Sequence, residues 1–327
     1  MIGSLNLPIA KGNAKTYVFA ASDGTLDPVG GTIRGVGHTT WQKPAGISFV
    51  YGLLIGPGTG GGGGHSFGAG TAGGGGGGGI PGPVLQFLQP AYLVPDILII
   101  TVGRGGRGGA AGTAGTLPNS FATVLNYRTK VLGNTNYGTS TNTIYAGPSG
   151  FYGFAGTPSG RAGSAVAGGN GGSAGGNLGT TSQPGIMGFS NFSLTSAPGG
   201  FNGGFAVAGT NATFLGRPQG GAGGGGVSSG VAFAGGNALG PTTSVNSIWS
   251  RDLLGGANTG VAGEDGITLF EPTLFFLPGA GGGGNASGVG GAGGKGGIGC
   301  GGGGGGAGTT GGRGGDGGDG LAILVCW

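Results

Sequence analysis

The sequence is poor in charged residues and in histidine, and both shortages argue against catalysis. Only 7% of its 327 residues are Asp, Glu, Lys or Arg, against about 25% in an average globular domain. The two histidines, His38 and His65, lie far apart in the sequence, whereas a metal centre or a histidine-based triad needs further groups beside them. We therefore expect no enzyme activity, no bound metal and no cofactor.

Net charge, long apolar runs and cysteine are scarce as well. Thirteen Lys and Arg against nine Asp and Glu leave a net charge of +4, so GRGGRGG (103–109) lacks the broad basic patch that nucleic-acid binding needs. No run approaches the roughly 18 apolar residues of a membrane span. The basic residues of the N-terminus follow its short apolar stretch, which is the wrong order for a secretory signal. Two cysteines, Cys300 and Cys326, cannot form a disulfide framework, and we expect free thiols.

Glycine, by contrast, is abundant, with 98 residues. Because each glycine costs about 1 kcal/mol in a helix interior, we expect almost no α-helix. Short apolar stretches bounded by Gly, Pro or the chain end are typical of β-strands. Three of them stand next to glycine tracts: 46–56, 96–103 and 320–327.

The glycine tracts have a period of three residues. Between Val289 and Asp319, nine of the eleven other residues fall on every third position, and only Cys300 and Thr309 do not. Three residues per turn is the repeat of the polyproline II helix. A helix with glycine on two of its three faces packs closely against several others, so we expect a bundle of polyglycine II helices. The remaining residues then lie on its outer surface or against a strand.

One helix over 289–319 would span roughly 95 Å at 3.1 Å per residue. That is too long for a compact domain, so we expect two or three passes that turn at Cys300 and Thr309. The predicted fold is therefore mostly irregular/β, with short strands, a polyglycine II bundle and long surface loops. The alternative is an array of disordered glycine-rich linkers, which need no such register.

Surface loops are expected near 116–160, 180–198 and 241–278. Aromatic residues among Ser, Asn and Gly are typical of antibody paratopes, and Trp and Arg are common in binding hot spots. The candidate binding residues are Tyr127, Tyr137, Tyr145, Phe151, Tyr152, Trp249 and Arg251. Alternatively, these aromatic side chains pack beneath the loops as small satellite cores.

Three motifs carry a resemblance to a known group of proteins. WQKPAG (41–46) leads into a strand and a glycine tract, ILIITVGRGGRGG (97–109) repeats that order, and GGRGGDGGDGLAILVCW (311–327) ends the chain. This layout resembles the glycine-rich domains of bacteriophage tail proteins. More loosely, it is similar to the adhesins at the tips of T-even-type tail fibres, which fold as a polyglycine II sandwich whose loops contact a bacterial receptor.

The resemblance implies a virion protein of the tail or tail-fibre tip, made in the cytoplasm of a host bacterium. Residues 1–40 would attach it to other tail or fibre proteins, and 41–327 would present loops to a protein or glycan receptor on the host surface. The alternative is a purely structural virion component, such as a fibre, capsid-decoration or tail-assembly protein, that forms homo-oligomers through its glycine-rich domain. An ice-binding protein is a third hypothesis, but the register positions mix Lys, Arg, Asp, Val and Ala too irregularly for an ice-binding face.

Overall fold

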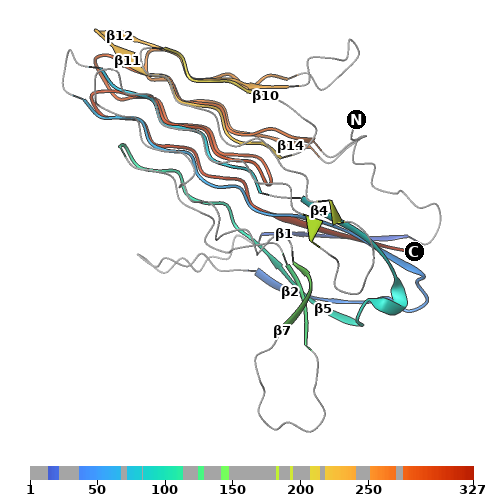
Figure 1. Cartoon of the computed structure of the whole chain (residues 1–327). Coiled ribbons are helices and arrows are strands. Elements are labelled where there is room, and N and C mark those ends of the chain that lie inside the picture. Colours follow the sequence, from blue (N-terminus) through green and yellow to red (C-terminus); the bar gives the residue numbers. More distant parts are fainter. Residues whose placement is uncertain are drawn as a thin grey trace.

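A computed structural model shows a group of β-sheets at one end of the molecule and a bundle of extended glycine-rich segments that leads away from them (Figure 1). It describes residues 14–21, 37–67, 72–82, 84–112, 124–128, 141–146, 182–183, 192–193, 207–213, 218–240, 251–269 and 275–327. Within these ranges there is no α-helix, and the 3-10 helix η1 (Ala91–Leu93) is the one helical turn. No described helix has the length and apolar character to cross a membrane. The expected fold class, mostly irregular and β, is confirmed.

Two four-stranded antiparallel sheets form the end that we call the base. The first has the order β1-β16-β3-β4, built from β1 (Lys15–Ala20), β16 (Leu321–Cys326), β3 (Phe49–Ile55) and β4 (Val84–Pro90). The second has the order β2-β5-β6-β7, built from β2 (Gly37–Gln42), β5 (Ile97–Val102), β6 (Val124–Arg128) and β7 (Thr141–Ala146). The three strands predicted from sequence are thus confirmed as β3, β5 and β16.

Four two-stranded pairs complete the strand inventory of the described residues. They are β8 (Ser182–Gln183) with β9 (Phe192–Ser193), β10 (Ala212–Thr213) with β13 (Ala238–Leu239), β11 (Val227–Ser228) with β12 (Val231–Ala232), and β14 (Thr268–Leu269) with β15 (Phe275–Phe276). The expected boundary after residue 40 falls inside β2, and β1 pairs with the C-terminal strand β16. Part of the N-terminal segment is therefore built into the same sheets as the rest of the chain.

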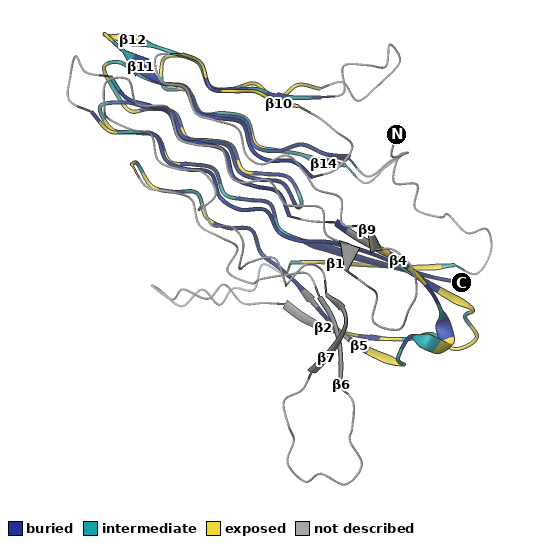
Figure 2. Cartoon of the chain, in the orientation of Figure 1, coloured by how far each residue is buried: buried dark blue, intermediate teal, exposed yellow. Residues whose placement is uncertain are grey.

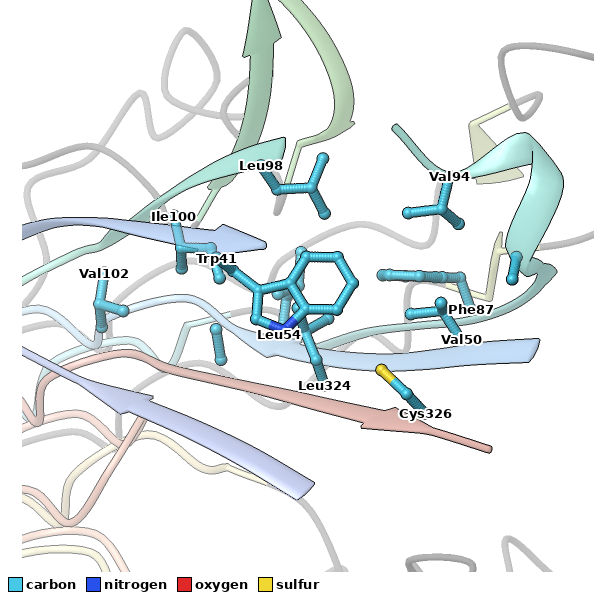
Figure 3. Packing of buried hydrophobic residues seen from close by; sticks show 12 residues of the cluster. Trp41, Val50, Leu54, Phe87, Val94, Leu98, Ile100, Val102, Leu324 and Cys326 are labelled. Atoms are coloured by element: carbon cyan, nitrogen blue, oxygen red, sulfur yellow. The ribbon is translucent and has the colours of Figure 1, made fainter. Parts of the chain in front are cut away.

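The C-terminal strand β16 is buried on both of its faces. Ala322, Leu324 and Cys326 lie in a core between the two sheets, with Trp41 at its centre (Figure 3). The alternate residues Leu321, Ile323 and Val325 pack on the other face, against Phe276 and Cys300 at the near end of the bundle. A strand covered on both faces has no polar side to alternate with, which explains its unbroken apolar sequence.

Hydrogen bonds between the glycine-rich segments recur at every third residue. Gly302, Gly305 and Gly308 donate their N–H groups to the carbonyl groups of Thr59, Gly62 and His65, at 3.1, 2.9 and 3.1 Å. Paired β-strands have a two-residue repeat, whereas a period of three is that of a polyproline II-type helix. The segments are therefore polyglycine II helices, as the register predicts.

Twelve such helices lie in the described ranges, and we number them PG1 to PG12 in chain order. They are PG1 (56–65), PG2 (73–82), PG3 (103–112), PG4 (207–213), PG5 (218–227), PG6 (233–240), PG7 (251–257), PG8 (261–267), PG9 (277–285), PG10 (289–298), PG11 (300–308) and PG12 (310–320). Their hydrogen bonds define three stacked rows. An outer row has the order PG3-PG12-PG10-PG8, a middle row PG1-PG11-PG9-PG7, and a third row PG2-PG5-PG6, with PG4 against the last two.

PG11 is an interior helix with six hydrogen-bonded neighbours. Its N–H groups donate in turn to PG5, PG1 and PG10, and its carbonyl groups accept in turn from PG12, PG9 and PG2. No face is left for a side chain, which explains the unbroken glycine run 301–306. On the outer helices PG10 and PG12 most register residues are exposed or half-buried, whereas the register residue Ala307 of PG11 is buried.

The last glycine tract makes three passes, PG10, PG11 and PG12, which confirms the expected turns near Cys300 and at Thr309. In place of the surface loop expected near 241–278, residues 251–257 and 261–267 form the helices PG7 and PG8. The expected loop 116–160 contains β6 and β7, which extend the second sheet, and 180–198 contains β8 and β9.

Candidate functional site at the tip of the bundle

The binding residues predicted from sequence are only partly within the described structure. Tyr127 lies in β6 and Tyr145 in β7, so these two tyrosines belong to sheet strands and not to a loop. The side chain of Arg251 is exposed, and its Nη2 lies 3.5 Å from Oε1 of Glu264. Tyr137, Phe151, Tyr152 and Trp249 lie outside the described residues. The predicted set is therefore not brought together as one site in the described ranges.

The end of the bundle opposite the sheets, which we call the tip, is built from short turns. Strands β3 and β5 continue into PG1 and PG3, while PG2 and PG12 lead back into β4 and β16, so these four helices all meet the sheets at the base. The hairpin β11–β12 marks the opposite end (Figure 1). The described turns there are 65–67, 110–112, 228–231, 257–261, 285–289 and 308–310. Exposed residues collect on turns at this end, and the bundle interior is buried (Figure 2).

Asn285 ties together two of the tip turns. Its Nδ2 donates to the carbonyl oxygens of Thr259 and Val289, both at 3.1 Å, and its Oδ1 accepts the N–H of Ser287 at 3.2 Å. Its own backbone N–H donates to Ala307, at the end of PG11. One short side chain thus joins the PG7–PG8 turn to the PG9–PG10 turn, beside the start of the PG11–PG12 turn.

Hydroxyl groups fix two further turns of the tip. Thr309 donates from both its backbone N–H and its Oγ1 to the carbonyl oxygen of Gly288, at 2.9 and 3.1 Å. Ser66 accepts the N–H of Gly311 at its Oγ, at 2.9 Å. Next to it, Phe67 is buried against Val227. The turns therefore hold one another in place through hydrogen bonds and a small apolar contact.

The β11–β12 hairpin turns through Ser229 and Gly230, whose φ angles are 47° and 78°. Two successive residues with positive φ are typical of the two-residue type I′ hairpin. Ser228, which stands in a G-x-S-x-G sequence, is part of β11 in this hairpin. The strand-to-helix turn of a hydrolase nucleophile is not formed here.

The described turns of the tip carry no charged side chain and mix exposed valines with hydroxyl and amide side chains. Val231, Val261 and Val289 have exposed fractions of 56, 51 and 61%. The described tip turns contain Ser, Thr and Asn but no Asp, Glu, Lys or Arg, and His65 is their one titratable residue. The sequence did not predict this site, because the predicted binding residues were chosen from loops rich in aromatic residues. The available signal was the set of places where the glycine register is interrupted by Asn, Ser, Thr and Val.

The two cysteine thiols lie toward the base, away from the tip, and both are buried. Burial raises the pKa of the Cys300 thiol from 9.0 to about 12, although the N–H of Gln219 donates to its sulfur. Burial likewise raises the pKa of Cys326 to about 11. Both cysteines are free, as expected. Among the described residues, no group of three His, Cys, Asp or Glu side chains is placed to hold a metal ion.

Neither a comparison with models of protein families nor a comparison with curated proteins yields a match for this chain.

Proposed function

We propose that the chain is a phage virion protein of the tail or tail-fibre tip, and that the tip of its bundle binds the host cell surface. The observation that carries the proposal is the hydrogen-bonded set of tip turns around Asn285 on a bundle whose interior helices have up to six bonded neighbours. A surface that is ordered before binding loses less conformational entropy when a receptor docks. The resemblance of the sequence motifs to phage tail proteins supplies the virion context.

The composition of the tip also supports binding there. Exposed valines next to Ser, Thr and Asn offer apolar contact area together with hydrogen-bonding groups, and the centre of a protein interface is likewise depleted of charged residues. The outer side of the bundle differs in charge, since Arg107, Lys295 and Asp265 are exposed there.

The proposal is tested by binding of the fluorescently labelled chain to a panel of bacterial strains, measured by flow cytometry. On a strain that binds the chain, Val289→Asp and Val231→Asp should each reduce binding about tenfold or more, because they place an unpaired charge in an interface. Val18→Asp is the matched control, because Val18 is 55% exposed but lies in β1 at the base. It should bind like the unaltered chain.

Two outcomes would overturn this assignment. If both tip variants bind as well as the control, the tip is not the binding surface, and replacement of 116–160 by a short linker then tests the loop predicted from sequence. If the intact chain binds no strain of the panel at micromolar concentration, receptor binding is wrong. The structural alternative, a fibre, decoration or assembly component, would then be the better account.

A further inference from the structure

Four charged residues lie in one line across the outer row of helices. Gly108 of PG3 donates its N–H to Oδ1 of Asp316 at 2.8 Å. Gly296 of PG10 donates to the backbone carbonyl of Asp316 at 2.8 Å, and the neighbouring N–H of Lys295 donates to Oδ1 of Asp265 at 2.7 Å. The line therefore runs from Arg107 on PG3 through Asp316 and Lys295 to Asp265 on PG8, and its charges alternate in sign.

Most residues of this line, and of the line next to it, are exposed. Arg107, Lys295 and Asp265 are exposed, and Asp316 is half-buried. The neighbouring line toward the tip consists of exposed residues, three of which are alanines: Ala110, Arg313, Ala292 and Ala262. The three alanine side chains do not project, and the one long side chain of this line, Arg313, pairs with Asp316. A second surface can therefore approach the charges closely.

We propose that this face binds a second copy of the chain around a two-fold axis parallel to the helices, between PG12 and PG10. Such an axis reverses the order of the line, so Arg107 faces Asp265 of the second copy and Asp316 faces Lys295. Every contact then joins opposite charges, as in an isologous interface. An axis across the helices would place each charge opposite itself, and that arrangement is repulsive.

An axis parallel to the helices keeps both bundles pointing in the same direction, so the two tips lie side by side at one end of the dimer. If the tips bind cells as proposed above, the dimer presents two binding surfaces at once and gains avidity. The dimer itself does not depend on what the tips bind, and its test uses no cells.

Sedimentation velocity of the full chain at low and high salt tests the interface. We expect a dimer at low ionic strength that weakens as salt screens the charges. Lys295→Glu should raise the dissociation constant of the dimer about tenfold or more, because it faces Asp316 of the other copy. Lys15→Glu makes the same charge change on exposed β1 and should leave the constant unchanged.

A mixing experiment tests the pairing itself. Asp316→Lys alone should also prevent the dimer, since it faces Lys295. An equimolar mixture of the Lys295→Glu chain and the Asp316→Lys chain should form dimers again, because each altered charge now meets its opposite. A monomer at low salt, an unchanged dimer in Lys295→Glu, or a mixture that stays monomeric would each overturn the proposal.

Discussion

Gly76 and Gly304 approach so closely that a Cβ atom added at Gly304 would lie 1.9 Å from the carbonyl oxygen of Gly76. The same closeness recurs along PG11, where a Cβ atom at Gly301 or Gly303 would meet a carbonyl oxygen at 2.1 or 2.0 Å. Because the neighbour in each case is backbone, it cannot rotate away as a side chain would. The helices hold together through main-chain hydrogen bonds at a separation that only glycine permits.

Gly304→Ala should therefore destabilise the fold by at least about 3 kcal/mol, the upper range for overpacked cores. Gly112→Ala is the matched control, because no atom lies within 4 Å of its added Cβ and only its φ of +69° opposes the change. A left-handed alanine costs about 1–2 kcal/mol. Denaturant unfolding followed by circular dichroism compares the two, and equal losses would mean that the helices are not packed as described.

Asp316 should stabilise the bundle through its carboxylate. It accepts the N–H of Gly108 and pairs with Arg313, and its side chain is 24% exposed. Asp316→Ala should cost about 1–2 kcal/mol, the range for an unsatisfied hydrogen-bonding group. Asp316→Asn retains an acceptor oxygen and should cost less. If both variants unfold at the denaturant concentration of the unaltered chain, the carboxylate has no structural role.

Asn285→Ala should loosen the tip while the sheets keep their order. It removes the donor to Thr259 and Val289 and the acceptor of Ser287. Hydrogen exchange should become faster over 257–261 and 285–289 but not over β16. Unchanged exchange in those two turns would show that the Asn285 side chain does not order the tip. The free energy of unfolding should fall by about 1–2 kcal/mol.

The two thiols should resist alkylation while the chain is folded. Both are buried, and the raised pKa values of about 12 for Cys300 and about 11 for Cys326 leave almost no thiolate near pH 8. Iodoacetamide should label both only after denaturation, whereas rapid labelling of the native chain would contradict their burial. A raised pKa in the folded state also means that the unfolded chain loses these protons first. Stability should therefore fall as the pH rises from about 9 toward 12.

Sequence patterns predict the parts of this fold that depend on local rules. Alternation and β-branched residues predicted β3 and β5, and the three-residue register predicted PG10, PG11 and PG12. The register did not predict PG7 and PG8, where single or paired glycines such as Gly263 and Gly266 stand among Leu, Val and Glu. PG7 and PG8 lie at the ends of their rows and have fewer neighbouring helices. Fewer of their positions therefore require glycine, and the three-residue period is not visible in their sequence.

The candidate site could not be predicted from the sequence for a different reason. Its turns are separated along the chain, and no local pattern says that Thr259 and Ser66 lie at the same end of the bundle. That placement follows from the direction of each helix in the rows, which is set by hydrogen bonds between distant segments. The prediction that Tyr127 lies in a loop was wrong for a similar reason. Tyr127 belongs to β6, and β6 pairs with β5 across a glycine tract in the sequence.

Amide hydrogen exchange, measured residue by residue over 289–319, tests the polyglycine II bundle most directly. In PG12 the N–H groups of Gly312, Gly314, Gly315, Gly317 and Gly318 donate to neighbouring helices. Those of Arg313 and Asp316 donate to no residue that the structure describes. We predict slow exchange at these glycines, fast exchange at Arg313 and Asp316, and slow exchange throughout 301–308. Uniform exchange at the rate of an unfolded chain would contradict the bundle and the tip surface that it supports.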